Sequence, residues 1–260
     1  MIKLEDIHVT FSPGQVMEKK AIQGISIDIQ EGDFISVVGS NGAGKTTFLN
    51  AIAGEANISS GAIFIDGQNV TNQKTYERAG LVARVFQDPL AGTCAELTVA
   101  ENMALGIRRG KKRRWLPAIS KQSRDLFATH LERLGLGLEN RLETPMFLLS
   151  GGQRQAVSLL MATLSPLKIL LLDEHTSALD PKTANFVMGL TQSMIVEKKL
   201  TALMVTHSLH QAIAFGNRMI MLHEGKVIDD IAEDQKNDLS VEQLLAKFGE
   251  TVDDDRLLLD

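Results

Sequence analysis

A glycine-rich segment that ends in a lysine and a threonine is the first part of the sequence with residues suited to chemistry. Residues 39–46 read Gly-Ser-Asn-Gly-Ala-Gly-Lys-Thr, which fits the phosphate-binding pattern G-x-x-x-x-G-K-[ST]. In this pattern backbone N–H groups surround a phosphate, Lys45 contacts the γ-phosphate and the Thr46 hydroxyl binds Mg²⁺. An ordinary glycine-rich turn is the alternative, but the apolar strand before the segment and the helical pattern after it argue against that turn. The segment therefore predicts a nucleoside triphosphate site.

Two acidic residues follow a short apolar run. Residues 169–174 read Ile-Leu-Leu-Leu-Asp-Glu, which is typical of a buried strand that ends in two carboxylates. Ligands of open α/β sheets bind at the carboxyl ends of strands. We therefore expect Asp173 to hold Mg²⁺, directly or through water, and Glu174 to polarise the water that attacks the γ-phosphate. Two solvated acids at a strand end are the alternative interpretation.

Residues 149–153, Leu-Ser-Gly-Gly-Gln, have both a structural and a functional explanation. Structurally, Ser150 and Gln153 form a capping box that would start a helix. Functionally, the Ser150 hydroxyl and the N–H groups of Gly151 and Gly152 would make a second anion site at a helix N-terminus. A capping box alone does not require two consecutive glycines, which are poor helix formers.

Hydrophobic periodicity predicts the elements that position these motifs. Alternation over the first thirty residues favours antiparallel strands, and the pair Asp66-Gly67 predicts a hairpin within residues 62–70. Elsewhere strand and helix patterns alternate, which predicts a mostly parallel sheet with helices on both faces and a helical insert from about residue 89 to 166. The expected strands are 34–38, 169–172 and 201–206, and a hairpin is expected over 218–228. One helix is expected to begin at residue 45, and the other expected helices are 97–107, 121–134, 150–164 and 181–196.

Composition indicates a globular protein. The chain has 260 residues, of which 44% are hydrophobic and 23% charged, and this length can bury one large core or two lobes. A single cysteine, Cys94, excludes an internal disulfide and a zinc site built on cysteines alone. A net charge of -5 argues against a dedicated duplex-DNA binder. The sequence has no apolar run of about 18 residues and no signal-peptide pattern at its start, so we expect a cytoplasmic protein.

The phosphate loop, the Leu-Ser-Gly-Gly-Gln segment and the acidic strand, in this order, resemble the ATP-binding cassette (ABC) ATPases. The resemblance covers about residues 1–230. It implies an α/β fold of the P-loop NTPase (RecA-like) type, with a mostly parallel sheet core, an antiparallel β subdomain and a helical insert that carries the signature.

The resemblance also implies roles for individual residues. Gln87 would be the Q-loop glutamine that touches Mg²⁺ and water, residues 177–180 would be the D-loop with Asp180, and His207 would be the switch histidine on the γ-phosphate. The implied catalytic residues are Glu174, His207 and Gln87, the metal ligands are Thr46, Gln87 and Asp173, and the signature acting in trans is Ser150, Gly151, Gly152 and Gln153. The implied nucleotide-binding residues are Phe11, Gly39, Ser40, Asn41, Gly42, Ala43, Gly44, Lys45, Thr46 and Thr47.

Some positions depart from the family pattern or leave alternatives open. His175 stands where proline usually follows the catalytic glutamate, and Ser208 stands where aspartate is frequent after the switch histidine. His175 is expected to alter the conformation or protonation near that glutamate, in a direction that the sequence leaves open. Phe11 falls where the family places an aromatic residue, usually tyrosine, that stacks on adenine, and a core position in its strand is the alternative.

The resemblance implies a single ATPase domain over residues 1–260. Residues 1–90 and 165–230 are expected to form the RecA-like core and the antiparallel β subdomain, and residues 91–164 the helical subdomain. Residues 231–260 are expected to form a C-terminal helix and an acidic tail, with order only in the first half of the stretch that begins at residue 241.

The implied cofactors are ATP and Mg²⁺, and the implied first partner is a second copy of the chain. In that head-to-tail dimer the signature of one copy closes over ATP held by the phosphate loop of the other. Further implied partners are separate transmembrane permease subunits, whose cytoplasmic helices dock beside the Q-loop and the helical insert, and an extracytoplasmic solute-binding protein. The implied location is the cytoplasmic face of the inner membrane, and nucleic acid is not an expected partner.

The run Asp-Glu-His-Thr resembles a branch of bacterial cassettes encoded with uptake systems, some of them proposed for aromatic amino acids, so import is the favoured direction. A cassette that acts on ribosomes, RNA or DNA is one alternative, but this chain has neither a second cassette nor a long coiled-coil insertion. A P-loop kinase or GTPase is another, and it would leave Leu-Ser-Gly-Gly-Gln unexplained. Residues 108–115 contain six basic residues beside the only tryptophan, which favours a solvated loop, with contact to anionic lipid or RNA as alternatives.

Overall fold

The computed structural model describes residues 1–111 and 119–251. The chain forms two compact units: unit 1 is Met1–Arg78 with Leu200–Asp260, and unit 2 is Ala79–Lys199. Residues 112–115 of the basic run and the acidic end beyond residue 251 lie outside the described residues. The finer subdomain boundaries expected from the sequence stay a prediction.

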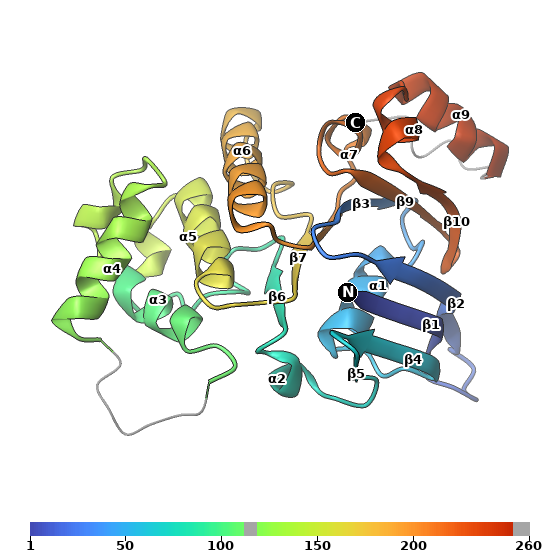
Figure 1. The fold of residues 1–260 in the computed structure, drawn as a ribbon, viewed down its shortest axis with the longest axis horizontal. Coiled ribbons are helices and arrows are strands. Elements are labelled where there is room, and N and C mark those ends of the chain that lie inside the picture. Colours follow the sequence, from blue (N-terminus) through green and yellow to red (C-terminus); the bar gives the residue numbers. More distant parts are fainter. Residues whose placement is uncertain (112–118, 252–260) are drawn as a thin grey trace. The chain divides into compact units, whose positions relative to one another are not determined.

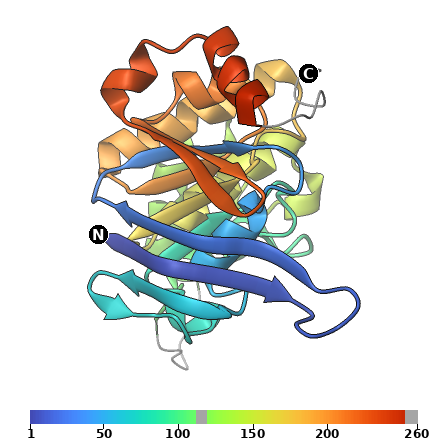
Figure 2. The ribbon, with the colours of Figure 1, turned by 90° about the vertical axis from the view of Figure 1, so that its right-hand side faces the viewer.

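An antiparallel sheet of unit 1 contains the N-terminal strands, in the order β2-β1-β4-β5. Buried and exposed positions alternate along much of β1, which confirms the half-buried strands expected from the sequence. The turn between β4 and β5 has positive φ at both Asp66 and Gly67, which is the geometry of the predicted hairpin. Figure 2 shows the two longest strands side by side. The bounds are β1 Ile2–Phe11, β2 Lys19–Ile29, β4 Ser60–Ile65 and β5 Gln68–Asn69.

The other strands of unit 1 surround β3, Phe34–Gly39, which is buried along its whole length. Strand β3 runs parallel to β8, Ala202–Val205, and to β9, Arg218–His223, and β9 pairs antiparallel with β10, Lys226–Ile231. These pairings confirm the expected parallel strands and the C-terminal hairpin. The helices of unit 1 are α1 Lys45–Ala53, α2 Thr75–Arg78, α7 Leu209–Ala214, α8 Glu233–Asn237 and α9 Val241–Thr251.

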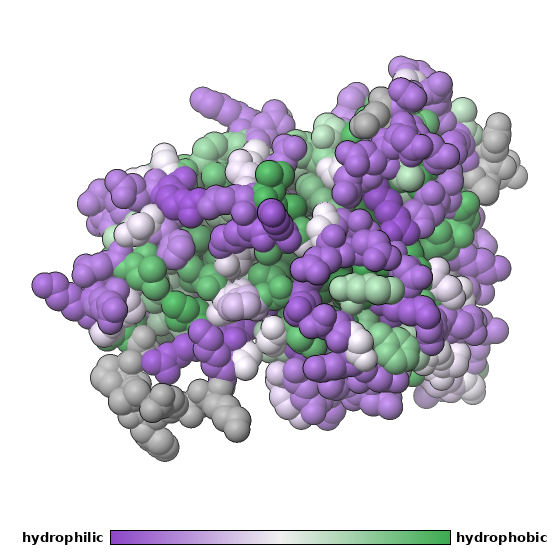
Figure 3. Space-filling view, viewed as in Figure 1, coloured by the Kyte–Doolittle hydropathy of each residue, from purple (hydrophilic) through white to green (hydrophobic). Residues whose placement is uncertain are grey.

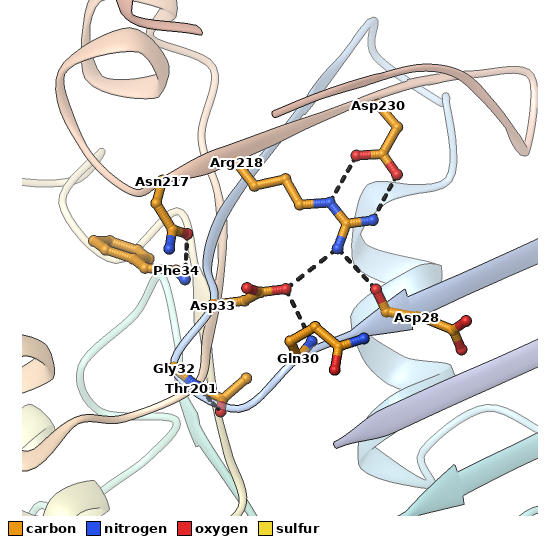
Figure 4. Close-up of polar contacts among 9 residues, drawn as sticks. All are labelled: Asp28, Gln30, Gly32, Asp33, Phe34, Thr201, Asn217, Arg218 and Asp230. Atoms are coloured by element: carbon orange, nitrogen blue, oxygen red, sulfur yellow. Dashed lines mark hydrogen bonds and ion pairs between the residues drawn. The ribbon is translucent and has the colours of Figure 1, made fainter. Parts of the chain in front are cut away.

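Arg218 holds the two sheets of unit 1 together (Figure 4). Its Nε and Nη2 atoms donate to the Asp230 carboxylate at 2.7 and 2.6 Å, and its Nη1 donates to the backbone oxygen of Asp28 at 2.7 Å and to Asp33 Oδ2 at 3.2 Å. These contacts, led by the hydrogen bond with Asp230, raise the pKa of Arg218. The neighbouring Asn217 accepts from the first N–H of β3 at 2.9 Å. The network therefore fixes the start of the strand that leads into the phosphate loop.

Unit 2 contains a parallel strand pair and the helical insert. Figure 1 shows α3, α4 and α5 grouped together, and a core of their apolar side chains is fully buried, including Met103, Phe127 and Val157. The expected helices and the strand at 169–172 are confirmed, whereas β6 was not expected because only four residues form it and one of them is charged. The bounds are β6 Val82–Val85, α3 Val99–Ile107, α4 Lys121–Glu132, α5 Gly151–Thr163, β7 Ile169–Asp173 and α6 Pro181–Lys198, with 3-10 turns at Leu138–Asn140 and Met146–Leu148.

The guanidinium of Arg109, within the basic run, binds backbone oxygens of unit 2. Its Nη1 donates to the backbone oxygens of Ala79 and Val82, both at 2.8 Å, and its Nη2 donates to those of Ala162 and Ser165 at 3.1 and 3.3 Å. Burial lowers the pKa of this guanidinium. The prediction of a solvated loop is therefore wrong for Arg109, because four carbonyl groups take the place of water around it.

Within the two described stretches of the chain, none of the helices combines the length and the apolar character needed to span a lipid bilayer.

Candidate functional site

The predicted phosphate loop connects β3 to α1 in unit 1. Gly39 is the last residue of β3, and Gly44 is the N-cap of α1 with φ +101°. A Cβ atom added to Gly44 would lie 2.6 Å from the backbone oxygen of Ala21, so only glycine fits this close approach. Because the cap residue has no side chain, it supplies no acceptor to the first-turn N–H groups of the helix. Such a helix start suits an anion.

Lys45, the first residue of α1, has only 6% of its surface exposed. Its Nζ donates to the backbone oxygens of Gly39 at 2.7 Å and Ser40 at 3.1 Å. The Ala43 N–H also donates to Ser40 O, at 3.1 Å, which closes the loop. Among the other predicted residues of this loop, Asn41, Gly42 and Thr46 are exposed and Thr47 is half-buried. The loop therefore carries an ammonium group and a helix N-terminus together, which fits a polyphosphate.

His207 lies on the turn after β8, also in unit 1, and it is exposed. The residues on either side hold this turn in place. The Thr206 N–H donates to Val37 O at 3.3 Å, and the Ser208 N–H donates to Thr206 Oγ1 at 3.1 Å. Ser208 also caps α7, since its hydroxyl oxygen accepts from the Gln211 N–H at 3.3 Å. Ser208, which stands where the family often has aspartate, is thus a good N-cap. It begins the short helix α7, which hydrophobic periodicity did not predict.

Phe11, the last residue of β1, is 45% exposed, whereas Ile7 and Val9 of the same strand are buried. The alternative that Phe11 is a core residue of its strand is therefore wrong. Its stacking on adenine stays a prediction.

Unit 2 brings together the predicted glutamine, the D-loop and the predicted catalytic glutamate. Glu174 follows β7 and has φ +47°, a left-handed conformation that is uncommon for this residue type. The N–H and hydroxyl of Ser177 both donate to the Glu174 backbone oxygen, at 3.0 and 2.9 Å. Gln87 Nε2 donates to the Ser177 hydroxyl oxygen at 3.1 Å. A hydrogen-bonded chain thus links Gln87 to the backbone of Glu174, and the turn that positions the carboxylate is fixed.

Asp173, the last residue of β7, is buried and forms an ion pair with Arg84 of β6. Arg84 Nη2 lies 2.5 Å from Asp173 Oδ2. Arg84 was not among the site residues predicted from the sequence. A signal was present, because Arg84 is the one charged residue between Leu81 and Phe86 in an otherwise apolar run.

His175, which replaces the usual proline, is buried and neutral. Its Nε2 lies 3.0 Å from the Thr191 hydroxyl oxygen, and that hydroxyl donates to Val187 O at 2.8 Å. Since the Thr191 hydroxyl proton is already used, His175 Nε2 carries the hydrogen and donates it. The histidine therefore ties the residue after Glu174 to helix α6, and burial lowers its pKa from 6.5 to about 4.

We expect this histidine to make the protein sensitive to acid. Because its pKa is lower in the folded chain, the unfolded chain binds the proton first as the pH falls below 6.5, and the free energy of unfolding decreases. The loss reaches about 3 kcal/mol near pH 4, at about 1.4 kcal/mol per pKa unit. The His175→Gln variant keeps an N–H donor for Thr191 but does not titrate, so urea unfolding at pH 7 and pH 4.5 should show a smaller loss than in the unsubstituted protein. Equal losses would contradict the buried neutral imidazole.

The predicted signature begins α5. Ser150 is the N-cap: its hydroxyl oxygen accepts from the Gln153 N–H at 3.3 Å, and Gln153 Oε1 accepts from the Ser150 N–H at 3.1 Å, which confirms the capping box. Gly151 is half-buried, and a Cβ added to Gly152 would lie 2.2 Å from Thr183 Cγ2. The second glycine therefore has a packing reason in addition to the anion site predicted from the sequence.

Asp180 of the predicted D-loop caps α6. Its Oδ1 accepts from the Thr183 N–H at 3.1 Å. Hydrogen bonds from the side chain and then from the backbone of Thr183 lower the pKa of Asp180. Thr183 therefore touches both the D-loop and the helix start of the signature, which places these two segments side by side within unit 2.

The side chains that could bind a metal ion here suit an ion that is held mainly by a nucleotide. The two described stretches contain no group of three or more His, Cys, Asp or Glu side chains arranged to hold a metal. Mg²⁺ usually keeps several waters and binds through one or two carboxylates and the phosphates of its substrate. A single buried carboxylate at a strand end, such as that of Asp173, meets this requirement.

Comparisons with known proteins give the family and the fold class of the chain. Residues 22–177 match the family described as ABC transporter. A tyrosine transport ATP-binding protein of Clostridioides difficile is 44% identical over 250 residues, which cover 95% of this chain and 98% of that protein. A methionine import ATP-binding protein of Streptococcus mutans is 31% identical over 253 residues, which cover 92% of this chain and 68% of that protein. A solved dimeric post-hydrolysis state of an ATP-binding cassette bound to ADP and Pi superposes with a TM-score of 0.76 and 30% identity, over 90% of this chain and 99% of that one.

These matches confirm the expected fold class, a P-loop NTPase α/β fold with a parallel sheet core and an additional antiparallel sheet. They also confirm that the chain is an ATPase. With a family match over more than half of its length, the chain belongs to the ABC transporter family, as an ATP-binding subunit.

Proposed function

We propose that this ATPase drives solute import by closing head to tail with a second copy of itself around ATP. The observation that carries the proposal is the start of α5, where exposed Ser150 caps a helix of 13 residues. The electropositive end of that helix is available to an anion that another chain presents. The phosphate loop of that other chain would hold the triphosphate. The dimeric assembly of a similar cassette supports this arrangement.

Within each site the residues would divide the work. Lys45 and the N-terminus of α1 would bind the β- and γ-phosphates, and Glu174 would accept a proton from the attacking water. Thr46, Gln87 and Asp173 would hold Mg²⁺, which when bound neutralises phosphate charge. His207 would contact the γ-phosphate.

The hydrogen bond from Gln87 to Ser177 would couple a movement of Gln87, on binding or loss of Mg²⁺, to the Glu174 backbone. Phe11 would stack on adenine, and Asp180 would place the D-loop beside the signature.

A cavity in unit 2 is the proposed docking site for a separate membrane permease. It has a volume of about 380 Å³ and is lined by the segment after Gln87 and by helices α3 and α5, including Gly92, Cys94, Leu105 and Met161. Figure 3 shows apolar side chains among hydrophilic ones over this helical part of the chain. A short cytoplasmic helix of the permease, with an apolar face, would suit such a lining. The ATPase would then lie at the cytoplasmic face of the inner membrane.

Relatives named for tyrosine transport and methionine import support an amino acid as the solute and import as the direction. An extracytoplasmic solute-binding protein would deliver that amino acid to the permease.

The dimer can be tested with a variant that binds ATP but hydrolyses it slowly. Glu174→Gln protein with ATP is expected to elute as a dimer in size-exclusion chromatography with light scattering, and as a monomer with ADP, because the γ-phosphate bridges the two copies. A second substitution, Ser150→Asp, is the matched control. Aspartate also caps helices well, so α5 is preserved, but its charge would oppose the triphosphate of the other copy.

The double variant should therefore bind ATP and stay monomeric. A Glu174→Gln protein that is monomeric at saturating ATP, or a double variant that still dimerises, would argue against closure across the signature.

A further inference from the structure

Arg84 lies against the carboxylate that is proposed to hold Mg²⁺. Its Nη2 is 2.5 Å from Asp173 Oδ2, and the Arg84 and Asp173 side chains are only 8% and 12% exposed. Loss of one partner from a buried pair of this kind is costly, because it leaves an uncompensated buried charge. Asp173 therefore has a counter-ion within its own chain before any metal arrives.

The position of Arg84 is set by the strands and by an aromatic ring. Strand β6 runs parallel to β7 with Arg84 opposite Leu171, so a long side chain on β6 reaches the carboxyl end of β7. The Arg84 Cζ atom lies 4.7 Å from the centre of the Phe86 ring, a distance typical of a cation–π contact. The ion pair with Asp173 and the contact with the Phe86 ring thus help to hold the guanidinium beside the carboxylate.

We propose that Arg84 is a competing counter-ion for Asp173 that weakens the binding of the divalent metal. A carboxylate paired with a guanidinium has less negative potential to offer a second cation, and the two cations repel each other. Arg84 would thereby favour release of the metal with the product. This inference rests on the proposed function, because it requires Asp173 to be a metal ligand.

The test compares the affinity of the nucleotide-loaded protein for Mn²⁺, used in place of Mg²⁺, among variants of Arg84. Free Mn²⁺ is measured by electron paramagnetic resonance with AMP-PNP as the nucleotide and protein in excess over it. Arg84→Met and Arg84→Gln remove the charge and are expected to bind Mn²⁺ about tenfold more tightly, the effect of one partly screened charge at short range. Arg84→Lys keeps the charge and is expected to stay within about threefold of the unsubstituted protein.

Binding of AMP-PNP in EDTA is the control for folding, since the phosphate loop belongs to unit 1. It is expected to stay within about twofold for all three variants, and circular dichroism should show unchanged helix content. Folded Arg84→Met and Arg84→Gln proteins that bind Mn²⁺ equally or more weakly would overturn the inference. If one of the two fails to fold, the other decides the test.

Asp173→Asn separates this inference from the proposed function. Weaker Mn²⁺ binding in that variant supports Asp173 as a ligand. An unchanged Mn²⁺ affinity would contradict both the ligand role of Asp173 and the inference about Arg84. Weaker binding in Asp173→Asn with no tightening in Arg84→Met and Arg84→Gln would overturn only the inference.

Discussion

Glu174→Gln protein is expected to hydrolyse ATP about 10²–10⁴-fold more slowly, the usual loss when a general base is removed. The amide has nearly the shape of the carboxylate but is not a base at neutral pH. The backbone of Glu174 is held by Ser177 through two hydrogen bonds that do not involve its side chain, so the turn should survive the substitution. ATP affinity should therefore change little.

The measurement is phosphate release at saturating ATP, together with equilibrium binding of a fluorescent ATP analogue. Glu132→Gln is the matched control, because Glu132 is an exposed residue of unit 2 at the end of α4 and the substitution makes the same change of charge. We expect normal turnover in that control. Near-normal turnover in Glu174→Gln would exclude Glu174 as the base.

Lys45→Ala protein is expected to bind ATP about 10–100-fold more weakly, from the loss of hydrogen bonds between a charged donor and phosphate. The ammonium group is buried and is held by Gly39 O and Ser40 O, so it is in place before nucleotide binds. Removing it also leaves those two oxygens without this donor. We therefore expect Lys45→Ala to lower the affinity for ATP and not only the rate of turnover.

Isothermal titration with ATP measures this affinity. Lys74→Ala provides the control, since Lys74 is an exposed lysine in the same unit and lies outside the phosphate loop. Both variants should be checked by thermal unfolding without nucleotide. An ATP affinity of folded Lys45→Ala protein equal to that of Lys74→Ala would contradict the assignment of the loop.

Much of the site was predictable from short stretches of sequence. The phosphate loop, the acidic strand and the capping box each depend on residues that are neighbours along the chain, so their patterns are complete within one segment. The longer helices were predictable for the same reason, because periodicity repeats within each of them. The short helices α2, α7 and α8 contain too few residues for such a repeat.

By itself, the sequence determined the P-loop ATPase fold, its signature and the identity of the groups that would do the chemistry. Only the tertiary structure decided which partners those groups have. Arg84 and Asp173 are 89 positions apart, and their pairing depends on the register between β6 and β7. The burial of His175 and the contact of Gly152 with Thr183 likewise depend on the packing of α6. Such contacts join residues that are distant along the chain, and no local periodicity encodes them.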